Sequence, residues 1–260
     1  MLMRRLSIAV IAAVSTVALT QIASAADLPR KAPPAPPPPP VFSWTGFYVG
    51  LNAGATWGDA DINWSASTTG FSSTGANAIN TFGPGNIKKT GFIGGGQVGY
   101  NYQIANFVWG LEADINYTGL SGTRTVTNIP VFGTPNSITQ TFESKWLATV
   151  RGRLGFSQGS WLIYGTGGLA VAQAKFSDNF TDPAGGVRAS SSDTTRTGWT
   201  AGGGAEWAYS RQWSVKLEYL YVDLGHTSDS TTAIIFPTAV IVSDHHVTEN
   251  IVRVGLNYHF

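Results

Sequence analysis

Apolar and polar residues alternate strictly along several stretches of the chain. The clearest example is VRVGLNYHF (252–260), in which every second residue from Val252 to Phe260 is apolar and the residues between them are polar or glycine. Successive side chains of a β-strand point to opposite faces, so a period of two predicts a strand with one apolar and one polar face.

Seven further stretches have the same period. They are residues 47–57, 92–103, 107–117, 146–156, 161–172, 199–209 and 213–221. In 161–172 the glycines leave open which residues form the apolar face. The pattern therefore predicts eight strands and no long helix.

The connections between these strands alternate in length. Short turns lie around Ala105, Gln158 and Arg211, whereas the segments 58–89, 119–144, 173–197 and 225–249 are long and rich in Thr, Ser, Asn, Asp and Gly. Short turns at one end and long polar loops at the other are typical of a transmembrane barrel. The fold class predicted is all-β, an eight-stranded antiparallel transmembrane up-and-down β-barrel.

Large aromatic residues lie near both ends of the apolar faces. One predicted girdle comprises Phe47, Trp109, Phe156, Trp207, Trp213, Tyr258 and Phe260, and the other comprises Trp57, Tyr117, Trp146, Trp199 and Tyr221. Ten residues of strand tilted by about 40° cover roughly 25 Å along the membrane normal, which matches the apolar band of an outer membrane. A soluble sandwich or lipocalin-like barrel also alternates, but two aromatic girdles favour the membrane.

The polar faces carry balanced charges. The acidic members are Glu112, Asp114, Glu206 and Glu218, and the basic members are Arg151, Arg153, Lys216 and Arg253. We expect Glu112 and Asp114 to lie beside Arg151 and Arg153, and the other four to lie together. Because eight strands enclose a space that side chains fill, the charges are interpreted as a plug. A charged constriction in a conducting pore is the alternative.

The first forty residues carry export signals. Arg4 and Arg5 precede an apolar run, and Ala23-Ser24-Ala25 has the form of a signal-peptidase site, which predicts cleavage between Ala25 and Ala26. Residues 26–41 are rich in proline, so we expect a polyproline II spacer in the periplasm, with a PxxP ligand as the sharper alternative. The barrel domain is predicted to span residues 42–260.

Composition excludes several chemistries. The net charge of +1 does not favour nucleic acid, and a chain without cysteine forms no disulfide and has no thiol for catalysis. Gly94 to Gly99 matches GxGxxG, but it lies inside a strand pattern without a following helix. Solvated loop residues are the preferred interpretation of His226, His245 and His246. We expect no cofactor and no metal.

The stretches FYVGLNAG (47–54), GWTAGGGAEWA (198–208), SVKLEYLYVDLG (214–225) and VRVGLNYHF resemble the porin-family small outer-membrane proteins of the RopB type. These proteins are related to OmpA-like barrels and opacity-type adhesins. The resemblance implies an outer-membrane location, contact with outer-membrane lipid, and a C-terminal signal at Tyr258 and Phe260 that the barrel-assembly machinery recognises.

Three functions follow as hypotheses. The first is a structural barrel that supports envelope integrity and displays its long loops to a surface ligand. The second is a narrow porin for small polar solutes. The third is a lipid-modifying enzyme using His226, Ser228 and a carboxylate such as Asp223, Asp229 or Glu249. The first is preferred, and no enzymatic activity is expected.

Overall fold

The computed structural model describes residues 42–69, 72–130, 135–181, 187–232 and 240–260. The predicted signal peptide, its cleavage site at Ala25 and Ala26, and the proline-rich spacer lie outside these residues.

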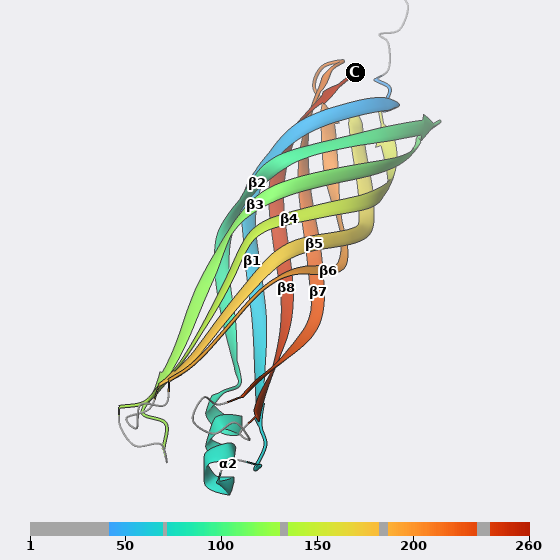
Figure 1. Ribbon diagram of the computed structural model, residues 1–260. Helices are drawn as coiled ribbons and strands as arrows, with labels where there is room; N and C mark the ends of the chain where they lie inside the picture. The colour runs from blue at the N-terminus through green and yellow to red at the C-terminus, as the bar shows by residue number, and fades with distance from the viewer. Residues whose placement is uncertain (1–41, 70–71, 131–134, 182–186, 233–239) are drawn as a thin grey trace, which may run out of the picture. The chain divides into compact units, whose positions relative to one another are not determined.

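Eight antiparallel strands form a closed barrel in which each strand pairs with its neighbours in the chain and β8 pairs with β1 (Figure 1). The strands are β1 (Gly46–Ala66), β2 (Gly85–Ile104), β3 (Phe107–Thr127), β4 (Ser137–Gln158), β5 (Trp161–Thr181), β6 (Val187–Ala208), β7 (Trp213–Thr232) and β8 (Val240–His259). One helix, α2 (Ser73–Phe82), lies between β1 and β2. No described helix is long and apolar enough to span a membrane.

Between the short turns and the second girdle, most outward side chains are apolar and most inward ones are polar, apart from a small apolar layer at the short-turn end. Both predicted aromatic girdles lie on the outer face, where Trp109 and Tyr117 of β3 are 57% and 61% exposed. The strand that the sequence left ambiguous is also resolved, because Trp161 and Ile163 of β5 are exposed whereas Leu162 and Tyr164 are buried.

The prediction that the strands end near the second girdle and give way to four long loops was wrong. The strands continue far beyond the second girdle, so that β1 runs on to Ala66 and β5 to Thr181. Most residues of the four polar segments are therefore paired in β-ladders.

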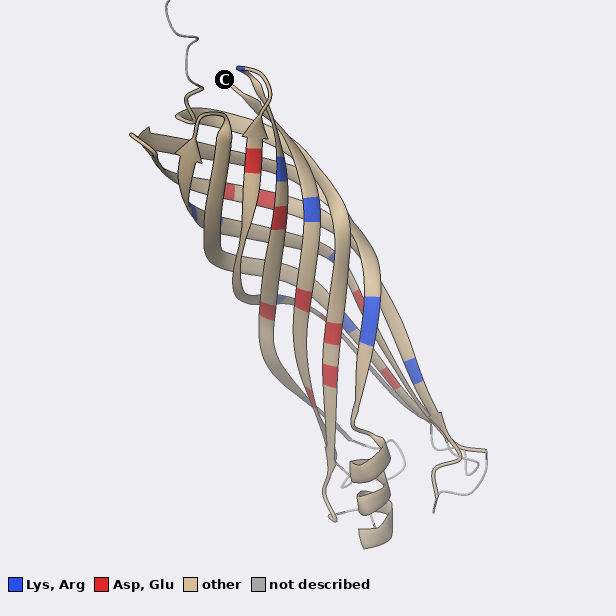
Figure 2. Cartoon of the chain, turned by 180° about the vertical axis from the view of Figure 1, so that it is seen from behind, with Lys and Arg blue, Asp and Glu red and all other residues tan. Residues whose placement is uncertain are grey.

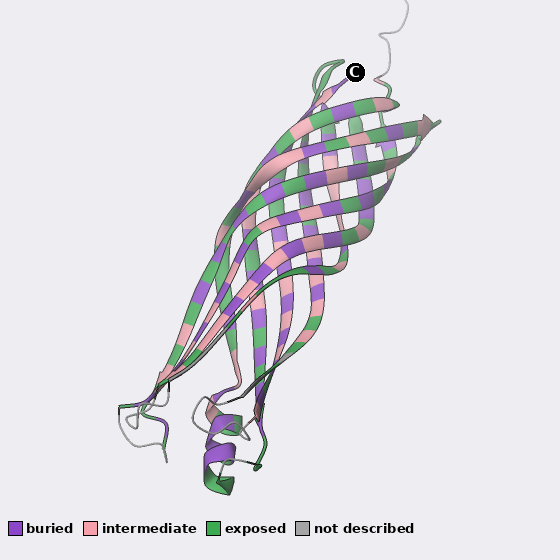
Figure 3. Cartoon of the chain, in the orientation of Figure 1, coloured by how far each residue is buried: buried purple, intermediate pink, exposed green. Residues whose placement is uncertain are grey.

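The two faces exchange polarity at the second girdle. In β1 the apolar residues up to Trp57 point outward, whereas Ala60, Ile62 and Trp64 point inward and are buried. Residues of the other strands join them in one apolar cluster, including Leu120, Phe142, Ala172 and Phe176. Figure 3 shows that buried and exposed positions still alternate along these strands. An outer face in water needs polar residues, and an inner face without water needs apolar ones. The alternation of side chains therefore continues, but the inward positions are now apolar and the outward positions polar.

Beyond the second girdle the barrel wall divides into two sheets. The β2–β3 ladder stops at Ile93–Thr118 and the β6–β7 ladder stops at Trp199–Asp223, while the other six ladders continue. One sheet contains β7, β8, β1 and β2, and the other contains β3, β4, β5 and β6. Figure 1 shows these two groups of strands separating toward the end that carries α2. The apolar cluster lies between them.

Helix α2 closes the division between β2 and β3. Ser72 caps its N-terminus by accepting a hydrogen bond from the Gly75 amide. At its C-terminus, Arg124 of β3 donates to the carbonyls of Phe82 and Gly83, and Gln140 of β4 also donates to Gly83. A cation at a helix C-terminus is favourable, so α2 ties the two sheets together on this side.

Candidate functional site: the charged interior

Arg151 lies at the centre of the barrel interior, opposite Glu112 in the β3–β4 ladder. Its guanidinium forms ion pairs with three carboxylates: Glu112, Asp114 at 2.8 Å and Glu218 at 3.1 Å. The predicted contact between the acidic pair of β3 and Arg151 is therefore present. Glu218 reaches the same guanidinium from β7 across the interior.

The other three cations complete a continuous network. Arg153 pairs with Glu206 at 2.6 Å, and Lys216 lies 2.8 Å from Glu112. Arg253 pairs with Glu218 at 2.6 Å and with Asp114 at 3.0 Å. All eight predicted charges thus lie inside the barrel, and their side chains are at most 1% exposed. Figure 2 shows acidic and basic positions at similar levels of the strands.

The expected group of Glu206, Lys216, Glu218 and Arg253 is present only in part. Glu218 pairs with Arg253 at 2.6 Å and lies 3.9 Å from Lys216, but Glu206 makes its ion pair outside the group. Glu206 and Lys216 are ladder partners on β6 and β7, but Glu206 pairs with Arg153 of β4 and Lys216 pairs with Glu112 of β3. An eight-stranded barrel is narrow enough for long side chains to span it. Contacts across the interior therefore compete with contacts along the wall.

Neutral polar residues fill the space around the charges. Tyr48 donates a hydrogen bond to Glu112 at 2.7 Å and accepts one from Arg153, and the Tyr164 ring lies 3.9 Å beneath the Arg153 guanidinium. Asn257 and Ser214 both donate to Glu206. Sequence reasoning missed these residues, although each occupies an inward position of the same alternation. Their hydrogen bonds satisfy charges that have been removed from water.

Apolar side chains close both ends of this network. At the short-turn end, Trp44 is fully buried and packs with Val108, Leu162 and Ala208. Its ring also meets the ring of His259 edge to face, with centroids 5.8 Å apart. At the other end lies the apolar cluster between the two sheets. The interior thus consists of two apolar layers with an ion-paired layer between them.

Glu249 is a buried carboxyl outside the network, just beyond the second girdle. Its hydrogen-bond partner is the Thr56 hydroxyl at 3.3 Å, and Val247 and Ile251 flank it on the inner face of β8. Its Oε1 has no hydrogen-bond partner among the described residues. Burial without a cation favours the neutral acid.

Burial raises the pKa of Glu249 to about 7. At pH 6 we therefore expect Glu249→Gln to change the free energy of unfolding by less than about 1 kcal/mol, because a neutral amide replaces a mostly neutral acid. The matched change Glu112→Gln should cost about 3–5 kcal/mol, because it leaves buried cations unpaired. Urea titration of the protein folded into lipid vesicles measures both values. Equal losses in the two variants would contradict the distinction.

The interpretation of the three histidines as solvated loop residues was wrong for His245, which is buried, and all three lie in strands. His226 and His246 stack on the outer face with ring centroids 4.2 Å apart, whereas His245 is buried and stacks on Phe176. His246 lies 3.2 Å from Asp223. No set of His, Cys, Asp or Glu within the described part of the chain could hold a metal ion.

The geometry around His226 does not match a nucleophilic triad. The His226 ring lies 3.2 Å from one oxygen of Asp244, and the Ser228 hydroxyl donates to the other oxygen at 2.8 Å. These two hydrogen bonds, led by that of His226, hold the pKa of Asp244 below its ordinary value. The carboxylate stands between the hydroxyl and the imidazole, so the histidine does not take the serine proton. Glu249 lies inside the barrel, and the Asp229 side chain is outside the described part of the chain.

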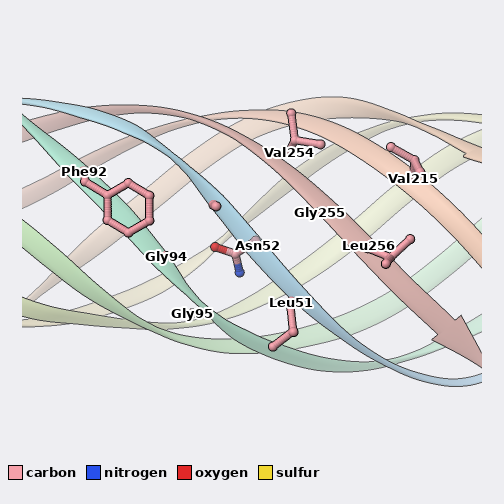
Figure 4. Close-up of a pocket in the computed structure, with 10 residues that line it drawn as sticks. Leu51, Asn52, Phe92, Gly94, Gly95, Val215, Val254, Gly255 and Leu256 are labelled. Carbon is pink, nitrogen blue, oxygen red and sulfur yellow. The ribbon is translucent and has the colours of Figure 1, made fainter.

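The glycines of the GxGxxG match lie within β2, without a helix after them. Gly94 and the neighbouring Gly95 border a hollow of about 690 Å³ on the outer surface, between Leu51, Phe92, Val254 and Leu256 (Figure 4). This hollow lies between the two girdles, where the surface is apolar. It therefore lies on the face that we expect to contact lipid rather than in the interior.

Comparisons with known proteins agree with this architecture. The family model described as "Outer membrane protein beta-barrel domain" matches residues 10–260. The 31 kDa outer-membrane immunogenic protein of Brucella melitensis biotype 1 is 35% identical over 258 residues, covering 98% of this chain and 97% of the relative. A 22 kDa outer membrane protein of Rhizobium leguminosarum bv. viciae is 33% identical over 168 residues, covering 64% of this chain and 68% of the relative.

Among solved structures, the outer membrane protein OprG of Pseudomonas aeruginosa aligns with a TM-score of 0.48 and 13% identity, covering 84% of this chain and 98% of that one. The fold and the family match define an integral outer-membrane β-barrel. The chain belongs to the outer membrane protein β-barrel family, and it is located in the outer membrane.

This location orients the barrel. Short turns face the periplasm and longer connections face the cell exterior in outer-membrane barrels. We therefore propose that the girdle containing Trp109 marks the periplasmic interface, that the girdle containing Tyr117 marks the outer interface, and that the two sheets with α2 form an extracellular region.

Proposed function

We propose that the protein is a non-conducting structural barrel that anchors a rigid extracellular β-region for contacts at the cell surface. The observation that carries this proposal is the layered interior, in which Trp44, the ion-paired network and the apolar cluster follow one another along the barrel. The relatives named as outer-membrane immunogenic proteins are compatible with exposure at a surface. A narrow porin is disfavoured because a charged pore needs water beside its charges.

The predicted histidine, serine and carboxylate do not favour catalysis either. The arrangement of His226, Asp244 and Ser228 does not activate a nucleophile. We therefore include the absence of enzymatic activity in the proposal. The remaining proposed partners are the lipid around the girdles, the barrel-assembly machinery acting on Tyr258 and Phe260, and a ligand of the extracellular region.

Planar-bilayer recording tests this proposal. The mature protein from Ala26, refolded in detergent and checked for heat-dependent gel mobility, is expected to give no reproducible single-channel steps, because buried ion pairs occupy the interior. An open porin prepared in the same way serves as the positive control. Regular steps from folded protein would overturn the proposal and favour a porin.

A further inference from the structure

The two divisions between the extracellular sheets differ in how they are closed. At the β2–β3 division, Arg124 and Gln140 bind the end of α2, and Gly122 lies against Ile87 and Lys89. At the β6–β7 division, the last ladder pair is Trp199–Asp223, and Gly198 lies against the backbone of Asp223 and Leu224. Beyond it, no ladder pair joins described residues of β6 and β7. We call residues 187–198 of β6 and 224–232 of β7 the β6/β7 seam.

Both strands of this seam have one edge without a ladder partner among the residues that the structure describes. Residues 187–198 of β6 pair only with β5, and residues 226–232 of β7 pair only with β8. The side chains of Thr195 and Thr197 on β6, and of Ser228 and Ser230 on β7, are exposed. The sheets nevertheless stay in contact inside, because Arg196 donates to the His245 carbonyl and lies over the Phe176 ring.

The β6 edge has only part of the usual protection against strand pairing. Natural edge strands are commonly protected by proline, charged residues (lysine above all) or a bulge. The β6 edge has the charges of Arg188, Asp193 and the buried Arg196, but not the other devices. Residues 187–198 contain neither proline nor lysine, and the β5–β6 register runs without irregularity to Thr181–Val187. Such an edge is suited to receive another strand through backbone hydrogen bonds.

The directions of the two edges determine which occupant fits. Strands β6 and β7 are antiparallel, so one foreign strand inserted between them would be antiparallel to one edge and parallel to the other. A second copy in the same membrane is related by a twofold axis along the membrane normal, which preserves strand direction. When the two seams face each other, β6 of each copy lies antiparallel to β7 of the other. Both copies use the same surface, so the assembly is complete with two protomers.

We propose that the β6/β7 seam is a homodimer interface, in which β6 of each protomer pairs with β7 of its partner. This proposal rests on the proposed function, because it makes the extracellular region the site of contact between copies. Within the membrane, the outer face of β6 between its girdle residues carries Ala201, Gly203 and Ala205. These small residues allow two barrels to approach closely beneath the paired edges.

Cysteine cross-linking tests the proposal cleanly because the native chain has no cysteine. Thr195→Cys and Ser230→Cys proteins are prepared separately, reconstituted together in lipid vesicles and oxidised. Only a contact between two protomers then joins residue 195 to residue 230. We expect the yield of this mixed dimer to be about tenfold or more higher than in the control mixture of Thr123→Cys with Ser230→Cys. Paired edges hold the two thiols near each other and so raise their effective concentration.

A second measurement uses a chain without new cysteines. Native mass spectrometry of the full mature protein should detect a dimer that Thr195→Lys weakens and that Thr123→Lys, on the outer face of β3, leaves unchanged. A charge on an edge strand opposes further pairing. Cross-linking no greater than in the control mixture, or a monomer in both measurements, would overturn the proposal.

The outcomes also separate this proposal from the proposed function. A folded, non-conducting monomer would reject the dimer and leave the structural function standing. Regular channel steps would reject the structural function whatever the cross-linking result. Hydrogen exchange could show that the β6 amides are protected on whole cells although the chain is monomeric. That result would mean that another protein pairs with the edge, and it would reject a second copy as the partner.

Discussion

Replacing Arg151 with Met should lower the free energy of unfolding by about 3–5 kcal/mol, among the largest expected effects of a single substitution in this barrel. The substitution removes the partner shared by Glu112, Asp114 and Glu218. Four buried carboxylates of the network would then face three cations. Urea titration in lipid vesicles, followed by tryptophan fluorescence and gel mobility, measures the loss.

Arg211→Met is the matched control, because Arg211 lies exposed in the short turn between β6 and β7. We expect its stability to change by less than about 0.5 kcal/mol. The double variant Arg151→Met with Glu112→Gln should lose less than the sum of its single changes, because it restores the charge balance. If Arg151→Met unfolds no more readily than Arg211→Met, the network is not a stabilising plug.

The second large effect is expected in the extracellular region. Ile62 is 1% exposed and belongs to the apolar cluster between the sheets. Ile62→Asp should destabilise this region by at least about 3 kcal/mol, because it removes apolar contacts and buries a carboxyl without a partner. Protease added to intact cells should then cut the extracellular strands, while the segments between the girdles stay protected.

Ser65→Asp places the same side chain on the outer face of β1, where Asp59 and Asp61 already occur. This control should resist protease as the unmodified chain does. Rapid cleavage of the unmodified chain in residues 58–66 would instead support irregular loops. Equal resistance of the Ile62→Asp and Ser65→Asp proteins would show that the polarity of the two faces is not reversed there.

The reversal of polarity explains why the strand ends predicted from the sequence stop at the second girdle. In β1, Trp57 is the last outward apolar residue, and the following apolar residues Ala60, Ile62 and Trp64 occupy the opposite phase. A search for one continuing apolar face therefore ends at Trp57. The residues before and after Trp57 both alternate with the period of a strand. The surroundings of the outer face change from lipid to water at this point, so the apolar residues change sides.

The eight strands, their order around the barrel, the two girdles and the inward position of the eight charges followed from the sequence alone. Each of these features is local, because alternation and aromatic position are encoded within single strands or between neighbours. Only the tertiary structure decided that Arg153 pairs with Glu206 rather than with a charge of the adjacent strand. It also decided that the β6–β7 ladder stops at Trp199–Asp223. Such features depend on the width and twist of the closed barrel, which set distances between strands that are far apart in the chain.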